Sequence, residues 1–223
     1  MKGAFISVEG ADGSGKTTHL DFIEHWLTDH GARVLRTREP GGTALGERLR
    51  GLLLDGGDVS ISEHAELLLF FADRAQHLAE VIEPALSADK WVLSDRFTDA
   101  TYAYQGGGRG MAMKDIKTLE ALTQGALQPD LTLLLDVPPK VGRMRVLQKD
   151  LTMLNTSADA ERARADRFEK QSMEFNKAVR KVYKQRAARF KHRIKTINAD
   201  QSVEQVRTEL DALLDTFWRE WRT

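Results

Sequence analysis

Residues 10–17 have the residue types and the spacing of a loop that binds phosphate. The run fits the pattern G-x-x-x-x-G-K-[ST] and reads Gly10-Ala11-Asp12-Gly13-Ser14-Gly15-Lys16-Thr17. The glycines let the backbone turn so that successive N–H groups point at one anion, and a following helix adds its positive end. Lys16 supplies a mobile charge for terminal phosphates, and the Thr17 hydroxyl can hold Mg²⁺. The stretch therefore predicts a nucleotide-phosphate site.

The sequence on either side of this loop fits a strand and a helix. Residues 4–8 form a short apolar run of the kind that becomes a buried parallel strand. After the loop, Leu20, Ile23 and Leu27 recur at helical spacing. Because a phosphate-binding loop joins a strand to a helix, this context favours the motif over a glycine-rich turn with a surface lysine.

An acid and an arginine follow a second apolar run. Asp95 and Arg96 come directly after residues 91–94, which read Trp-Val-Leu-Ser. An aspartate at such a strand end can approach the Mg²⁺ shell beside a phosphate loop. The adjacent guanidinium can hold a phosphate through two parallel hydrogen bonds. The alternative is a structural ion pair at the end of the strand.

Residues 37–43 read Thr-Arg-Glu-Pro-Gly-Gly-Thr and predict a turn after a further strand. Pro-Gly-Gly turns the chain, and Thr43 is placed to cap the next helix. A plain turn does not need both Arg38 and Glu39 at a strand terminus. We therefore favour a functional loop over a purely structural turn.

Two other stretches combine aromatic rings with hydrogen-bonding side chains. Phe70 and Arg74 lie four residues apart on a predicted helix and share one face, which suits stacking on a base and bonding to its edge. An aromatic residue on a helix is, however, more often part of the core. Residues 101–110 place Tyr104 and Gln105 beside four glycines, which indicates a special loop that lines a pocket. A flexible linker explains that composition equally well.

Basic residues are concentrated in the C-terminal part of the chain, although the net charge is zero. Between Arg143 and Arg193 they outnumber acidic residues more than twofold. This asymmetry indicates a local anionic partner more than bulk nucleic acid. For the basic residues at 177–193 we favour the interpretation that they form a solvated helix face over one in which they bind an anionic partner. Arg162 and Arg164 are candidates for side chains that close over phosphates.

The rest of the pattern alternates strands with helices. Strands are predicted at about 3–9, 32–37, 90–95, 131–136 and 193–197. Helices are predicted at about 16–30, 43–54, 62–87, 113–126, 139–150, 166–190 and 202–221. This order predicts an α/β fold with a five-stranded parallel sheet flanked by helices, in which ligands bind beyond the C-terminal ends of the strands.

Length and composition narrow the class of protein. The 223 residues, 41% of them hydrophobic, suit one domain with one core. The absence of cysteine excludes disulfides and Cys-based zinc or iron–sulfur sites. No long apolar run marks a signal peptide or a membrane span. We therefore expect a cytoplasmic protein without a membrane or nucleic-acid partner.

Taken together, these motifs resemble those of the thymidylate kinase family in its bacterial form. The matching stretches run in family order over about residues 3–190 and comprise Glu9–Thr18, Thr37–Thr43, Phe70 with Arg74, Asp95–Phe97, Tyr104–Gly110, Pro129–Asp136 and Asp166–Glu169. Arg-Glu-Pro-Gly-Gly together with Tyr-Gln-Gly-Gly-Gly-Arg-Gly is far more specific than the phosphate loop alone. The resemblance implies a three-layer P-loop fold of the nucleoside-monophosphate-kinase type with a helical lid.

The resemblance also implies the reaction and the residues that perform it. The γ-phosphate of ATP would pass to dTMP, which gives dTDP and ADP, with Mg²⁺ as cofactor. The implied ATP site is Gly10, Ala11, Asp12, Gly13, Ser14, Gly15, Lys16, Thr17, Thr18 and Arg145. The implied dTMP site is Asp12, Glu39, Arg50, Phe70, Arg74, Arg96, Thr101, Tyr104 and Gln105. Implied catalytic residues are Lys16, Asp95, Arg96, Arg162 and Arg164, and Mg²⁺ would be held by Thr17 and Asp95, directly or through water.

Family members of this type carry a catalytic arginine on the lid instead of in the phosphate loop. Residues 11–14 contain no arginine, whereas Arg162 and Arg164 precede the Asp-Arg-Phe-Glu motif. The chain departs from the family at residues 151–160, which look inserted into a lid of about 143–167. With this longer lid, Arg143, Arg145 and Lys149 compete with Arg162 and Arg164 for the catalytic role. The resemblance further implies a single domain over residues 1–223 and a homodimer, with the apolar helix at 65–78 as a candidate interface.

Three rival functions share the phosphate loop. A kinase for another nucleotide or a deoxynucleoside would differ in its acceptor pocket. A nucleotide-binding scaffold without catalysis would not need the lysine of the loop, Asp95 with Arg96, or arginines on a lid. A switch that binds GTP or ATP is the third rival, and guanine recognition needs the pattern Asn-Lys-x-Asp. The chain has Asn-Lys only at 176–177, followed by Ala-Val within a predicted helix.

Overall fold

The computed structural model describes residues 2–54, 60–154, 168 and 171–222. Within them, five parallel strands form one sheet in the order β2-β3-β1-β4-β5. The strands are β1 (Phe5–Glu9), β2 (Val34–Arg38), β3 (Trp91–Asp95), β4 (Leu131–Asp136) and β5 (Ile194–Asn198). Each lies where the sequence predicts a strand, so the predicted parallel α/β sheet is confirmed.

The described residues contain α-helices and two π-helical segments, η1 and η2. In chain order they are α1 (Lys16–Asp29), α2 (Ala44–Leu54), α3 (Glu63–His77), η1 (Leu78–Ile82), α4 (Glu83–Ser87), α5 (Thr98–Thr101), η2 (Tyr102–Gly108), α6 (Met113–Gln124), α7 (Pro139–Leu154), α8 (Met173–Arg189) and α9 (Val203–Trp221). None of the helices described here is long and apolar enough to cross a membrane.

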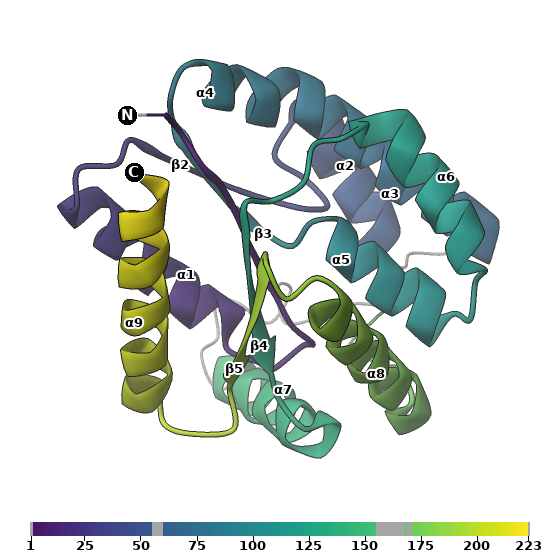
Figure 1. Cartoon of the computed structure of the whole chain (residues 1–223). Helices are drawn as coiled ribbons and strands as arrows, with labels where there is room; N and C mark the ends of the chain where they lie inside the picture. The colour runs from purple at the N-terminus through teal and green to yellow at the C-terminus, as the bar shows by residue number, and fades with distance from the viewer. Residues whose placement is uncertain (1, 55–59, 155–167, 169–170, 223) are drawn as a thin grey trace.

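Helices cover both faces of the sheet and so make three layers (Figure 1). The central strand β1 illustrates why both faces must be covered: every one of its residues is buried. Ile6 and Val8 pack into the core formed with α1 and α9, whereas Phe5 packs into a core on the opposite face. A central strand of a parallel sheet has no solvent face, and its sequence is accordingly apolar throughout most of its length.

Two predicted helix ends differ from the structure. α8 begins at Met173, after Ser172, whose hydroxyl accepts a hydrogen bond from the Phe175 N–H at 3.1 Å, whereas the prediction began at residue 166. The helix predicted at 139–150 continues to Leu154 and so includes the start of the apparent insertion. Residues 155–160 of that insertion lie outside the described residues.

The prediction of a loop or linker at residues 101–110 is wrong for most of the stretch. α5 continues directly into η2, and the chain is helical from Thr98 to Gly108. The glycines serve close packing here: a methyl group on Gly107 would lie 2.8 Å from Val182 of α8, and one on Gly108 would overlap the ring of Phe175. Glycine thus brings two helices together at this point.

Because the strands are parallel, the loops that follow them begin at the same edge of the sheet. Val8 lies opposite Asp95 in the ladder between β1 and β3, and Arg38 lies opposite Asp95 in the ladder between β2 and β3. The phosphate loop, the turn at Glu39 and the turn at Arg96 therefore begin side by side. The next helix starts as predicted, since Thr43 accepts a hydrogen bond from the Gly46 N–H at 2.8 Å.

Candidate active site

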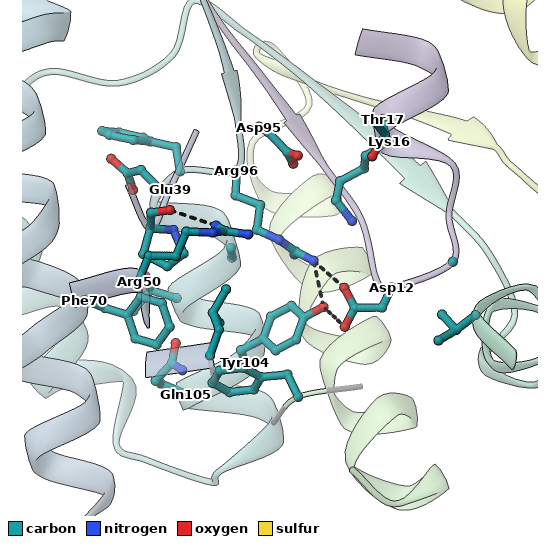
Figure 2. A pocket seen from close by; sticks show the side chains of 18 of the residues that line it. Asp12, Lys16, Thr17, Glu39, Arg50, Phe70, Asp95, Arg96, Tyr104 and Gln105 are labelled. Carbon is teal, nitrogen blue, oxygen red and sulfur yellow. Dashed lines mark hydrogen bonds and ion pairs between the residues drawn. The ribbon is translucent and has the colours of Figure 1, made fainter. Parts of the chain in front are cut away.

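A cavity of about 550 Å³ lies at this edge of the sheet, and most of the predicted site residues line it (Figure 2). Those that do are Asp12, Gly13, Gly15, Lys16, Thr17, Thr18, Glu39, Arg50, Phe70, Arg74, Asp95, Arg96, Thr101, Tyr104, Gln105 and Arg145. The predicted residues Gly10, Ala11 and Ser14 belong to the phosphate loop but do not line the cavity. Arg162 and Arg164 lie outside the described residues.

The phosphate loop connects β1 to α1 as the motif requires. Gly15 has φ +86°, a conformation that favours glycine, and Lys16 begins the helix directly after it. The Lys16 ammonium donates to the carbonyl oxygens of Gly10 at 3.1 Å and Ala11 at 3.2 Å. Burial and the nearby Arg96 lower the pKa of Lys16. The loop therefore holds a mobile cation over its own backbone, where a phosphate would supply stronger acceptors.

The residues at the start of α1 and the end of β3 fit a magnesium ion. Asp95 has one carboxylate oxygen, Oδ1, that is buried without a hydrogen-bond partner. Thr17 offers a hydroxyl in the first turn of α1, and both residues line the cavity. The described residues contain no cluster of three or more His, Asp or Glu side chains that could hold a metal. One carboxylate and one hydroxyl suit Mg²⁺, which takes few ligands from a protein and the others from water and from the phosphates of a nucleotide.

Arg96 stands at the centre of the cavity in an uncommon backbone conformation. Its φ is +70°, which costs free energy for any residue with a Cβ. Three hydrogen bonds hold the turn: the Arg96 N–H donates to Val8 at 3.0 Å, and the Ser94 hydroxyl donates to the Arg96 carbonyl at 2.7 Å. The next N–H, of Phe97, donates to Glu9 Oε1 at 2.8 Å. The strained turn aims the Arg96 side chain across the phosphate loop.

The two terminal nitrogens of Arg96 have different partners. Nη2 donates to Asp12 Oδ1 at 2.6 Å and to the Tyr104 hydroxyl at 3.1 Å (Figure 2). Nη1 donates to the Gly10 carbonyl at 3.0 Å and to the Tyr183 hydroxyl at 3.3 Å. The guanidinium also lies 4.8 Å from the centre of the Tyr104 ring. Four hydrogen bonds thus hold one cation at the boundary between the phosphate loop and the rest of the cavity.

Burial changes the ionisation of the groups around Arg96. Glu9 is fully buried, and this desolvation, with a further contribution from Asp99, raises its pKa to about 8. Arg96 and the hydrogen bonds from Tyr183 and Phe97 act in the opposite direction. Burial likewise raises the pKa of Tyr104 and of Tyr183, so both hydroxyls keep their protons. Nearby tyrosines and Asp12 raise the pKa of Arg96 against its own desolvation.

A second buried arginine lies on the far side of the cavity. Arg74 is 1% exposed, its Nε donates to Glu39 Oε2 at 2.9 Å, and its Nη2 forms an ion pair with the same oxygen at 2.7 Å. Nη2 also donates to the Thr101 hydroxyl at 3.0 Å, while Nη1 is buried without a partner. Glu39 in turn contacts His77 Nδ1 at 3.0 Å, and His77 Nε2 contacts the Thr37 hydroxyl at 2.6 Å. A chain of polar contacts therefore fixes Arg74 and leaves one of its nitrogens available.

Rings and amides complete this half of the cavity. Phe70 lines it from α3, and Gln105 lines it from η2 with its amide nitrogen donating to Glu66 at 2.9 Å. Arg50 donates from α2 to the Pro40 carbonyl at 2.8 Å. On the phosphate-loop side, Arg145 of α7 donates to the Ala199 carbonyl at 2.9 Å and contacts Gly13 at 3.4 Å. The arrangement places planar and hydrogen-bonding groups opposite the phosphate loop.

Several residues that organise the site were not predicted. Glu66 and His77 share α3 with Phe70 and Arg74, at helical spacings of three and four residues that could have marked one polar face. Glu9 begins the stretch Glu9–Thr18 that carries the family resemblance, but it is not among the predicted site residues. Tyr183 lies in the basic helix interpreted as solvated, and nothing in the local sequence distinguishes it. Its role depends on contacts 174 and 87 positions away along the chain.

Asp73 leads to a prediction about stability. Its Oδ1 accepts a hydrogen bond from Gly41 at 2.9 Å, its Oδ2 is buried without a partner, and burial together with Glu39 raises its pKa to about 7. Between about pH 4 and pH 7 the unfolded chain loses this proton while the folded chain keeps it. The free energy of unfolding therefore falls as pH rises, and this loss is complete above pH 7.

Asp73→Asn should remove this pH-dependent loss, because asparagine mimics the protonated acid. Relative to wild type, the variant should gain stability as pH rises from about 4 to about 7, by up to about 1.4 kcal/mol per pH unit, and the difference should level off above pH 7. Urea unfolding at several pH values measures the difference. Asp21→Asn, at an exposed surface ion pair, is the control. A stability difference for Asp73→Asn that does not vary with pH would contradict the assignment.

Comparisons with known proteins agree with this geometry. A family model described as thymidylate kinase matches residues 8–210. Thymidylate kinase of Pseudomonas putida is 51% identical over 214 residues, which cover 96% of each chain. That of Nitrosospira multiformis is 48% identical over 218 residues, 98% of this chain and 100% of the relative. The crystal structure of thymidylate kinase from Ehrlichia chaffeensis superposes with a TM-score of 0.75 at 31% identity, over 96% of this chain and 99% of that one.

The matches extend over nearly the whole chain and include both the phosphate loop and the residues opposite it. With a family model over residues 8–210 and relatives near 50% identity, the chain belongs to the thymidylate kinase family of phosphotransferases.

Proposed function

We propose that this chain transfers the γ-phosphate of ATP to dTMP and that one cavity holds the two nucleotides end to end. Membership of the thymidylate kinase family supports the reaction. The observation that carries the arrangement is the position of Arg96, whose side chain contacts the phosphate loop through Gly10 and Asp12 and the opposite half of the cavity through Tyr104. Donor and acceptor phosphates would meet at this arginine.

The phosphate loop is the proposed donor half. Its N–H groups and Lys16 would hold the ATP phosphates, with Arg145 beside them. Mg²⁺, held through Thr17 and Asp95 directly or by water, would offset charge on these phosphates. Arg162 and Arg164 are the proposed lid arginines on the basis of the family resemblance. Within a single kinase domain of residues 1–223, they would add positive charge from a lid at about 143–167.

The half of the cavity lined by Phe70 and Arg74 is the proposed dTMP site. Phe70 offers a ring on which thymine can stack, and the unpartnered Nη1 of Arg74 lacks an acceptor that a pyrimidine carbonyl would supply. Arg96 would bind the acceptor phosphate with Asp12 beside it. The remaining predicted residues of this half would surround the nucleotide and are Glu39, Arg50, Thr101, Tyr104 and Gln105.

The chain contributes position and charge more than covalent chemistry. Phosphoryl transfer spreads negative charge over the equatorial oxygens of the moving group, and preorganised cations stabilise that charge. Lys16 lies on the donor side and Arg96 on the acceptor side of the proposed transfer point. Closure of the proposed lid over the bound nucleotides would keep water away from the same point and so protect ATP from hydrolysis.

Removal of either cation should abolish most turnover without loss of the fold. For Lys16→Ala and Arg96→Ala we expect kcat to fall about 10²- to 10³-fold, the usual cost of deleting one preorganised charge donor. A coupled assay of ADP release with ATP and dTMP measures this, and circular dichroism checks folding. Arg36→Ala, at a surface pair with Asp21 and Glu24, should retain activity. Near wild-type rates for either cavity variant would overturn the roles assigned here.

A panel of acceptors tests the substrate. With ATP as donor, kcat/KM should be highest for dTMP among dTMP, dUMP, dCMP, GMP and AMP. dUMP lacks only the methyl group, so it should react about 10- to 200-fold less efficiently. The purine nucleotides should be poorer, because their rings are larger than the pocket proposed for thymine. A higher kcat/KM for any other acceptor would redirect the proposal to that nucleotide.

We also propose that the protein is a cytoplasmic homodimer. Four leucines of α2, α3 and α6 are exposed despite their size: Leu45, Leu52, Leu68 and Leu122. A second copy that covers them would remove apolar surface from water. Light scattering should then report twice the 25.1 kDa chain mass, and Leu68→Lys should shift the population towards one chain. A single-chain mass for the wild type at micromolar concentration would contradict the dimer.

A further inference from the structure

Tyr183 reaches the candidate active site from α8, far along the chain from the motifs that form the cavity. Its side chain is 3% exposed and does not line the cavity. The hydroxyl accepts a hydrogen bond from Arg96 Nη1 at 3.3 Å and donates to Glu9 Oε2 at 2.8 Å. A guanidinium has donors only, so the hydroxyl must give its single proton to Glu9 and present a lone pair to Arg96.

The four partners of the Arg96 terminal nitrogens divide into two sets. Asp12 and Tyr104, which hold Nη2, both line the cavity, and an entering anion can compete with them. The Gly10 carbonyl and Tyr183, which hold Nη1, do not line it. Nη1 is therefore anchored by groups outside the cavity, whereas Nη2 lies beside groups that line the cavity. Contact between Nη2 and an anion in the cavity depends on this fixed orientation of the guanidinium plane.

Glu9 extends the anchor to the backbone of Arg96. Its Oε2 accepts the Tyr183 proton, and its Oε1 accepts the N–H of Phe97, directly after the strained φ of +70°. One buried carboxyl group thus holds both the turn that carries Arg96 and the hydroxyl that contacts its guanidinium. Glu9 and Tyr183 together restrict Arg96 both at its backbone and at its guanidinium group.

We propose that Tyr183 is a positioning residue for phosphoryl transfer: supported by Glu9, it anchors Nη1 of Arg96 so that Nη2 faces the acceptor phosphate. The inference rests on the proposed function of Arg96. It assigns to α8 a part in the reaction that the motifs of the family do not describe. Because small displacements of a reacting group lower rates strongly, the missing hydroxyl should be detectable in the kinetics.

Tyr183→Phe removes the hydroxyl and keeps the buried ring. We expect kcat/KM for dTMP to fall about 10- to 100-fold, the loss typical of a hydrogen bond to a charged group, with the KM for ATP within about twofold of wild type. Tyr102→Phe is the matched control, because that hydroxyl also donates to a carboxylate, of Glu120, but does not contact Arg96. Wild-type kinetics for Tyr183→Phe would overturn the inference, as would an equal loss in Tyr102→Phe.

A double-mutant cycle separates positioning from general support of the fold. If Tyr183 acts through Arg96, then Tyr183→Phe should cost little further activity in an Arg96→Ala background, whereas independent effects would multiply. Multiplicative losses would therefore overturn the inference. Full activity of Arg96→Ala itself would instead show that the proposed function of Arg96 is wrong. The two failures are thus distinguishable in one series of four proteins.

Discussion

The compensation of one partly buried positive charge, that of Arg96, underlies the arrangement of this site. Arg96 lies between the phosphate loop and the pocket opposite it, and its charge is compensated by Asp12, the Gly10 carbonyl and two tyrosine hydroxyls. A buried cation without such partners would be very costly. An acceptor phosphate that competes with Asp12 for Nη2 would replace one negative charge with another, so the compensation persists as the nucleotide binds. Asp12 can thereby serve both the loop and the acceptor site.

Carboxylates also compensate arginines at a distance from the phosphate loop. Arg74 is paired with Glu39, and Arg186 and Arg193 are paired with Asp99, all of them largely buried. Buried ion pairs contribute little net stability, because the cost of desolvation offsets much of the attraction. Their value here is geometric: each carboxylate restricts a long, flexible side chain to one orientation. For Arg74, which lines the cavity, this restriction would favour contact with the edge of a planar ligand.

The elements and the phosphate loop could be predicted because their signals are local, whereas most residues of the opposite half of the cavity were predicted through the family resemblance. Strand runs, helical spacing and the phosphate-loop pattern each occupy fewer than about twenty residues, and parallel strands bring their ends together by topology alone. The contact between Glu9 and Tyr183 could not be predicted in this way, since the two residues meet across 174 positions and no local pattern indicates their pairing. Arg162 and Arg164 lie outside the described residues, so their predicted role stays a prediction.

The glycines of η2 show how a local reading can mistake the function of a residue. Gly107 and Gly108 suggest flexibility in the sequence, yet they lie against Ala178, Val182 and Phe175 of α8, where any side chain would overlap. Their small size lets α8 pack closely on η2, and η2 carries Tyr104 into the cavity. Because α8 packs closely on η2, the Tyr183 hydroxyl of α8 comes within hydrogen-bond distance of Arg96. The absence of side chains at Gly107 and Gly108 therefore helps to determine where the Arg96 guanidinium lies.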